Sequence, residues 1–91
     1  MTTLNVKVTN SMKKDLKRMA KRQKSVVELE PIIENLARKE ALPKQYKDHA
    51  LSGEWSGYRE CHIQPDWLLI YQVKLDILYL ARTGTHSDLF R

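Results

Sequence analysis

The sequence contains very little cysteine, glycine and proline, and it has no long apolar run. Cys61 is the only cysteine among 91 residues, so no internal disulfide can form and a reducing cytoplasm is the expected environment. With three glycines and three prolines, the chain shows no linker, repeat or low-complexity stretch, which indicates one domain over residues 1–91. No apolar run is longer than that of Trp67–Tyr71, which is far too short to span a membrane, and the N-terminus does not resemble a signal peptide.

Acidic residues are outnumbered by basic ones, eleven against sixteen, which leaves a net charge of +5. That sign favours a polyanionic partner, either nucleic acid or an acidic protein segment. The excess is concentrated at positions 13–24, where only Asp15 opposes the basic residues. On a helix this segment would form a basic face that either contacts phosphates or is simply solvated. The face consists of Lys13, Lys14, Lys17, Arg18, Lys21 and Arg22.

The first half of the chain predicts one strand and two helices. Alternating apolar residues at 4–8 indicate a short strand, and Asn10-Ser11 supplies N-cap chemistry for the first helix. Ser25 and Glu28 resemble a capping box that opens the second helix, which then either kinks at Pro31 or begins there. The side of the first helix expected to face the core comprises Met12, Leu16, Met19, Ala20 and Gln23.

The second half predicts a loop followed by three strands. Residues 46–57 lose apolar periodicity, and strand-like runs follow at 58–63, 67–73 and 77–82. Their short connections mean antiparallel hairpins. The order βααβββ predicts an α+β fold in which a two-helix hairpin packs on one face of a small, largely antiparallel four-stranded sheet.

All three histidines lie at the edges of predicted elements, where side chains can converge at one rim of a sheet. His49 is in the loop, His62 is near a strand end, and His86 follows the last strand. If residues 63–65 form a turn, His62 and Asp66 face each other across the hairpin with Cβ atoms about 4.5–5.5 Å apart. Alternatively, Asp66 caps the turn after Pro65.

Histidines and an aspartate without a serine or cysteine nucleophile motif suit the cleavage of RNA, because the 2′-hydroxyl is itself the nucleophile. Histidine transfers protons well near neutral pH. Arg59 and Arg82, on neighbouring predicted strands, would stabilise the developing phosphate charge. The candidates for stacking on bases are Trp55, Tyr58, Trp67 and Phe90, of which Trp67 is expected in the core and Phe90 at the site.

A zinc site is the competing interpretation of the histidines, since three histidines and a carboxylate can ligate zinc. No HxxH or HxxxH pair is present, so no metal is expected. Cys61 points to the opposite face of its strand from His62, and we expect a small buried residue rather than a nucleophile.

Two blocks of sequence carry a specific resemblance. The first runs from Tyr46 to Tyr71 and includes Asp48-His49, Gly53-Glu-Trp55, Gly57-Tyr58-Arg59 and His62-Ile-Gln-Pro65-Asp66-Trp67. The second is Arg82-Thr-Gly84-Thr85-His86-Ser-Asp-Leu89-Phe90. Both resemble the YafQ branch of the RelE superfamily, whereas the helical half is similar only in its layout.

The resemblance implies a RelE-like toxin domain that acts, without a cofactor, as a ribosome-dependent mRNA interferase. Such an enzyme cleaves codons in the ribosomal A site and is silenced by a cognate, DinJ-like antitoxin. The basic helix would then dock on the RNA of the 70S ribosome, or be wrapped by an acidic antitoxin segment, or both.

The same resemblance assigns roles to individual residues. His86 is expected to be the general acid and Asp66 the general base, with His49 and His62 orienting the substrate and Phe90 positioning a base of the RNA. A catalytic aspartate base needs a raised pKa, so transfer of the base role to His49 or His62 is the alternative.

The functional alternative is a non-catalytic basic subunit that acts with its antitoxin as an operator-binding corepressor. Nothing in the sequence resembles a helix-turn-helix or a ribbon reader. Operator DNA is therefore expected to be contacted only through the antitoxin.

Overall fold

The computed structural model describes residues 3–90. Helices and strands follow one another in the order β1 (Asn5–Val8), α1 (Asn10–Lys21), α2 (Glu30–Ala37), β2 (His49–Ala50), β3 (Arg59–Gln64), β4 (Trp67–Lys74), β5 (Ile77–Gly84) and α3 (His86–Leu89). Short 3₁₀ turns lie at Val26–Leu29, Lys44–Tyr46 and Gly53–Trp55. Within this described range no helix is long and apolar enough to cross a membrane.

The strands form one mixed sheet in the order β1-β5-β4-β3-β2, with β1 parallel to β5 and the other pairs antiparallel. The expected α+β architecture is confirmed, but the sheet has five strands rather than four. The additional strand is His49–Ala50, which pairs with β3 inside the segment predicted to be a loop. Two residues are too few to show an alternating apolar pattern, so the strand leaves no signal in the sequence.

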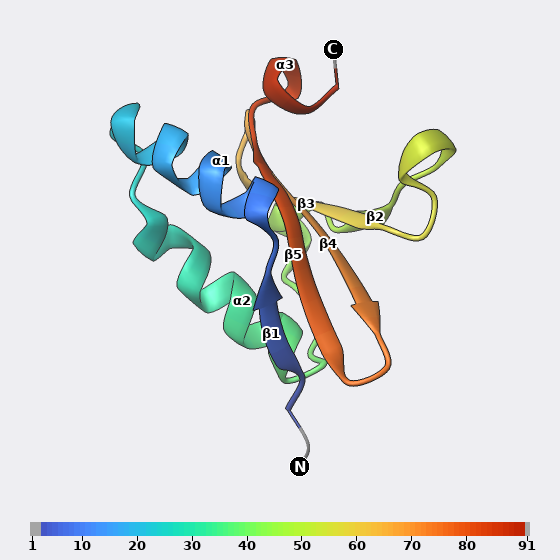
Figure 1. Ribbon diagram of the computed structural model, residues 1–91. Coiled ribbons are helices and arrows are strands. Elements are labelled where there is room, and N and C mark those ends of the chain that lie inside the picture. Colours follow the sequence, from blue (N-terminus) through green and yellow to red (C-terminus); the bar gives the residue numbers. More distant parts are fainter. Residues whose placement is uncertain (1–2, 91) are drawn as a thin grey trace.

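Helices α1 and α2 run in opposite directions across one face of the sheet (Figure 1). The main core lies between them and the sheet and includes Met12, Met19, Ile32, Leu69 and Leu78. A second, smaller core lies on the other face, where Leu68, Ile70, Ala81 and Leu89 meet Leu51, Trp55 and Tyr58. The segment 51–58 and α3 therefore cover the face of the sheet that the two long helices leave open.

The predicted cap of α1 is wrong by one residue. The N-cap is Thr9, whose hydroxyl accepts a hydrogen bond from the N–H of Met12 (3.0 Å) and donates one to the carbonyl of Ala81 (2.8 Å). The helix also ends at Lys21, so Gln23, with φ = 63° in the left-handed region, lies beyond it rather than on its buried side.

The predicted capping box at Ser25 and Glu28 is also wrong. Ser25 makes no side-chain cap hydrogen bond, and residues Val26–Leu29 form a 3₁₀ turn instead. Helix α2 begins at Glu30, so Pro31 opens the helix and does not kink it. A proline in the first turn costs no hydrogen bond, because the first four N–H groups of a helix have no partner within it.

The hairpin between β3 and β4 differs from the predicted register. Gln64 pairs with Trp67, and an irregularity between His62 and Gln64 places His62 opposite Leu68. The turn therefore consists of Pro65 and Asp66, and Asp66 does not face His62 across the hairpin. The register irregularity moves this carboxylate to the end of the sheet, toward the start of α3.

Candidate functional site

Three histidine rings and one phenylalanine ring form a row along one rim of the sheet. The ring centroids are 6.2 Å apart between His49 and His62, 5.9 Å between His62 and His86, and 6.4 Å between His86 and Phe90. The rings come from β2, β3 and α3, which are distant in sequence. The expected convergence of the histidines is confirmed, and Phe90 stands at the end of the row with 40% of its surface exposed.

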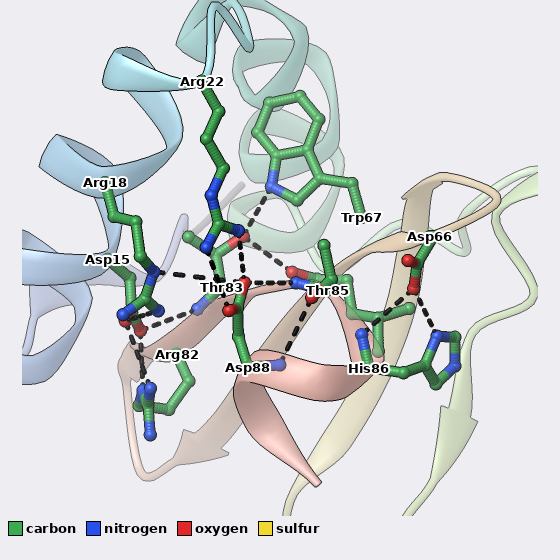
Figure 2. A network of polar contacts seen from close by, with 11 residues as sticks. Asp15, Arg18, Arg22, Asp66, Trp67, Arg82, Thr83, Thr85, His86 and Asp88 are labelled. Atoms are coloured by element: carbon green, nitrogen blue, oxygen red, sulfur yellow. Dashed lines mark hydrogen bonds and ion pairs between the residues drawn. The ribbon is translucent and has the colours of Figure 1, made fainter. Parts of the chain in front are cut away.

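Asp66 holds His86 at two points (Figure 2). Its Oδ1 lies 2.7 Å from Nδ1 of the His86 ring and accepts a second hydrogen bond, 3.0 Å long, from the backbone N–H of His86. These two hydrogen bonds, that of the backbone N–H first, lower the pKa of Asp66 below its usual value. An ionised carboxylate only accepts, so Nδ1 carries a proton and Nε2 of His86 is left for a substrate.

Glu60 is a buried carboxylate between the other two histidines, and it was not among the residues predicted for the site. Its Oε1 lies 3.5 Å from Nε2 of His49 and 3.4 Å from Nε2 of His62. Only 4% of Glu60 is exposed. Strand alternation could have revealed it, because residues 60 and 62 of one strand point to the same side of the sheet.

A network around Asp48 secures the start of β2. Asp48 accepts hydrogen bonds from the hydroxyl of Tyr71 (2.5 Å) and from the guanidinium of Arg59 (3.3 Å). The adjacent His49 uses its Nδ1 to donate to the carbonyl of Lys47, 2.7 Å away, since a carbonyl only accepts. Arg59, predicted to bind substrate, is thus engaged with Asp48 while nearly half of its side chain is exposed.

Arg82 is turned away from the histidine row. Its guanidinium donates to Asp15 of α1 through Nε (2.6 Å) and Nη2 (3.1 Å), and Figure 2 shows it on the far side of α3 from His86. From the sequence, Arg82 was expected beside a substrate phosphate, and no partner was predicted for Asp15. Asp15 is in fact 2% exposed and also accepts a hydrogen bond from the N–H of Thr83 (3.1 Å).

The two tryptophans, Trp67 and Trp55, lie in different surroundings. Trp67 is fully buried, as expected, and its indole N–H donates to the hydroxyl of Thr83 (2.9 Å). Trp55, expected to contact substrate, packs edge-on against Tyr58 with ring centroids 5.2 Å apart and belongs to the second core.

Cys61 is fully buried, and burial raises the pKa of its thiol to about 12. The expected burial of Cys61 is confirmed, and a thiol whose pKa is raised is a poor nucleophile at neutral pH.

The predicted basic face of α1 divides into two groups. Its four lysines are exposed, and these are Lys13, Lys14, Lys17 and Lys21. Its two arginines instead form ion pairs within the molecule: Arg18 with Asp15 (2.6 Å) and Arg22 with Asp88 (2.7 Å). The face available to a partner is therefore mainly lysine.

A pocket of about 290 Å³ opens beside His62. It is lined by Gln45, Tyr46, Lys47, His62, Ile63, Gln64 and Pro65. His62 belongs both to this lining and to the histidine row, so a group bound near His62 has a cavity to enter.

Within the described residues, one cluster has the composition of a metal site. His49, Glu60 and His62 offer ligand atoms that all lie within 4.8 Å of one another. Two imidazoles and a carboxylate form one of the common catalytic zinc ligand sets. The same three side chains thus suit either proton transfer or a transition metal.

The sequence and the fold of this chain match those of known toxins. Residues 4–91 match the family described as bacterial toxin of type II toxin–antitoxin system, YafQ. The mRNA interferase toxin YafQ of Escherichia coli K12 is 40% identical over 87 residues, which cover 94% of this chain and 95% of that protein.

Two solved structures share the whole fold. A copper-bound mutant toxin from Helicobacter pylori has a TM-score of 0.92 at 42% identity, covering 96% of this chain and 99% of that one. The E. coli DinJ–YafQ toxin–antitoxin complex contains a chain with a TM-score of 0.89 at 39% identity, covering 98% and 99%. The chain described here therefore belongs to the YafQ family of bacterial toxins of type II toxin–antitoxin systems.

Proposed function

We propose that this protein is an endoribonuclease toxin that cleaves mRNA codons in the ribosomal A site and so inhibits translation in the cytoplasm. The observation that carries the proposal is the row of His49, His62, His86 and Phe90 along one rim of the sheet. Imidazoles spaced about 6 Å apart can carry out both proton transfers of a phosphodiester cleavage, from the attacking hydroxyl and to the leaving oxygen. The similarity to the E. coli mRNA interferase toxin supports the same activity.

In the proposed reaction the 2′-hydroxyl of the substrate attacks the adjacent phosphorus after losing its proton to a general base. The bond from phosphorus to the 5′-oxygen breaks, and His86 Nε2 donates a proton to that leaving oxygen. The products are a 2′,3′-cyclic phosphate and a 5′-hydroxyl. Asp66 keeps Nδ1 of His86 protonated and aims Nε2 at the substrate.

The general base is better assigned to His62 or His49 than to Asp66. A carboxylate whose pKa is lowered is a weaker base than an ordinary one, and Asp66 is already occupied by two hydrogen bonds from His86. Phe90, at the other end of the row, is suited to stack on a base of the codon.

Expression of the protein in growing bacteria, followed by primer-extension mapping of mRNA ends, tests the activity. We expect growth arrest and in-frame cuts, with cleavage reduced at least 10²-fold in His86→Gln. The alternative of a non-catalytic corepressor subunit predicts that the wild type and His86→Gln behave identically and that mRNA stays intact. That result would refute the nuclease assignment.

The proposed chemistry needs no metal, although the His49, Glu60 and His62 cluster can accept one. Cleavage should persist after treatment with EDTA in ribosomes whose magnesium is then restored. Added Zn²⁺ or Cu²⁺ should inhibit, because it would occupy the imidazole nitrogens that transfer protons. Loss of activity on chelation, with recovery on adding zinc, would instead establish a metalloenzyme.

The proposed partners are the 70S ribosome with its mRNA and a DinJ-like antitoxin. The exposed lysines of α1 suit both ribosomal RNA and an acidic antitoxin segment. Operator DNA would be contacted only through the antitoxin.

A further inference from the structure

Helix α3 is too short to hold its own position. It has four residues, His86–Leu89, and a single helical turn is unstable by itself because its nucleation cost exceeds what one or two hydrogen bonds return. The turn nevertheless carries His86 at its start, and Phe90 directly follows it. Something outside α3 must fix where these two side chains lie.

Asp88 is the residue through which α3 is attached to the rest of the molecule. Its carboxylate accepts from Nη1 (2.7 Å) and Nη2 (3.2 Å) of Arg22 and from the N–H of Thr85 (2.9 Å). Its own N–H donates to the hydroxyl of Thr85 (3.2 Å), which completes a capping box. Gly84 leaves room for this arrangement, since a Cβ there would lie 2.9 Å from Oδ2 of Asp88.

Arg22 keeps Asp88 charged. Its guanidinium is the main reason that the pKa of Asp88 lies far below the usual range. A bidentate contact between a guanidinium and a carboxylate fixes the orientation of the two groups as well as their distance. The pair joins the end of α1 to α3 across 66 positions of sequence.

Helix α1, which ends just before Arg22, is itself held to the sheet. Asp15, in the middle of α1, is buried and accepts from Arg18, from Arg82 and from the backbone of Thr83 on β5. Figure 2 shows the resulting series of alternating charges, Arg82–Asp15–Arg18–Asp88–Arg22, running from β5 through α1 to α3.

We propose that Arg22 and Asp88 are positioning residues, which hold α3 so that His86 and Phe90 stay aligned with His49 and His62. The proposal rests on the proposed nuclease function. Asp66 orients the His86 ring, while the Arg22–Asp88 pair sets where the turn that carries it lies. A displacement of about 1 Å at a reacting group can reduce a rate by about 10²-fold, so the position of α3 matters directly for the reaction.

The test uses Arg22→Gln, Asp88→Asn and the double variant. Asparagine at 88 keeps an oxygen for the N–H of Thr85, so Asp88→Asn removes the charge and preserves the cap. Arg38→Gln is the matched control, because it removes an arginine from an exposed ion pair with Glu34 (4.0 Å) on α2.

Two measurements are made on each folded variant. With programmed ribosomes, we expect kcat to fall about 10-fold or more in both single variants while KM stays within about two-fold. The double variant should lose no more than the worse single variant, because both changes break the same pair. Arg38→Gln should match the wild type.

Amide hydrogen exchange provides a second measurement that needs no activity. The N–H groups of Leu89 and Phe90 donate to Thr85 (3.1 Å) and His86 (2.8 Å), and these bonds hold the turn closed. They should exchange at least about 10-fold faster in Arg22→Gln and Asp88→Asn, with the amides of β4 unchanged.

Specific results would overturn the proposal. If Asp88→Asn leaves kcat and exchange unchanged while Arg22→Gln raises KM, Arg22 is a docking cation and not a positioning residue. Should Arg22→Gln unfold, Arg22→Lys decides the question. A lysine keeps the charge but loses the bidentate contact, so Arg22→Lys should lower kcat by a smaller factor than Asp88→Asn does. If the wild type cleaves no RNA, the proposed function fails, and exchange at Leu89 and Phe90 alone decides whether the pair holds α3.

Discussion

His86 donates two hydrogen bonds to one atom, Oδ1 of Asp66. One bond involves the ring and the other the backbone, so rotation of the ring and movement of the residue are restricted together. Asp66 itself is exposed, at 65% of its side chain, and its pKa is lowered mainly by the backbone N–H of His86. These features describe a carboxylate that orients an imidazole and remains ionised while doing so.

Replacing Asp66 by asparagine tests that role. We expect kcat to fall about 10-fold or more, because an amide holds the protonated Nδ1 less strongly than a carboxylate does. If Asp66 acts only through His86, the double variant Asp66→Asn/His86→Gln should be no slower than His86→Gln alone in single-turnover cleavage. A further loss of about 10²-fold or more in the double variant would identify Asp66 as the general base.

At the scale of elements, the start of α1 determines where the basic helix lies on the sheet. The hydroxyl of Thr9 both caps α1 and donates to the carbonyl of Ala81 on β5. One side chain therefore satisfies a helix terminus and links the helix to the central strands. The buried Asp15, six positions further along the chain, makes a second link.

Thr9→Ala should lower the free energy of unfolding by about 1–2 kcal/mol, since it removes the N-cap and the bond to β5. Ser11→Ala, at the cap position suggested by sequence alone, is the control and should change stability by no more than about 0.5 kcal/mol. Urea denaturation of both variants measures the difference. Equal losses would contradict the assignment of Thr9 as the cap.

At the scale of the whole molecule, the basic residues behind the net charge of +5 have two roles. Arg18, Arg22 and Arg82 balance Asp15 and Asp88 within the structure. The lysines of α1 at positions 13, 14, 17 and 21 remain exposed on the outer side of the helix. Arginine suits the internal pairs because its planar fork binds carboxylates at two points, whereas lysine suits a solvated face that meets phosphates.

Replacing those four lysines by glutamine should weaken binding to 70S ribosomes by at least about 10-fold at low salt and flatten its salt dependence. The melting temperature should stay within a few degrees, because the changed side chains are exposed. Filter binding over a range of salt concentrations measures the affinity for the ribosome and its salt dependence. Unchanged ribosome affinity combined with lost antitoxin binding would assign this face to the antitoxin instead.

The lowered pKa values of Asp66 and Asp88 make the fold sensitive to acid. A carboxyl with a lowered folded pKa stabilises the protein above its unfolded pKa of about 3.9, and this contribution is lost as the pH falls through the folded value. Stability should therefore fall from about pH 5 downward. In Asp88→Asn the decline should be shallower, as measured by urea titrations between pH 6 and pH 2; an identical slope would contradict the role of Asp88.

The sequence by itself determined the elements and the set of reacting groups. Apolar periodicity is local, so it predicted β3, β4, β5 and the body of α1 to within one or two residues. The histidines stood at element ends, and the hairpin connections brought those ends together. The two resembling blocks also predicted the family correctly.

Only the tertiary structure decided which charged group meets which. The irregular register after His62 put Asp66 beside His86, and strand pairing placed the buried Glu60 beside His49 and His62. The Arg22–Asp88 pair joins residues 66 positions apart. Such contacts depend on register and helix packing over the whole chain, and no local pattern of residues specifies them.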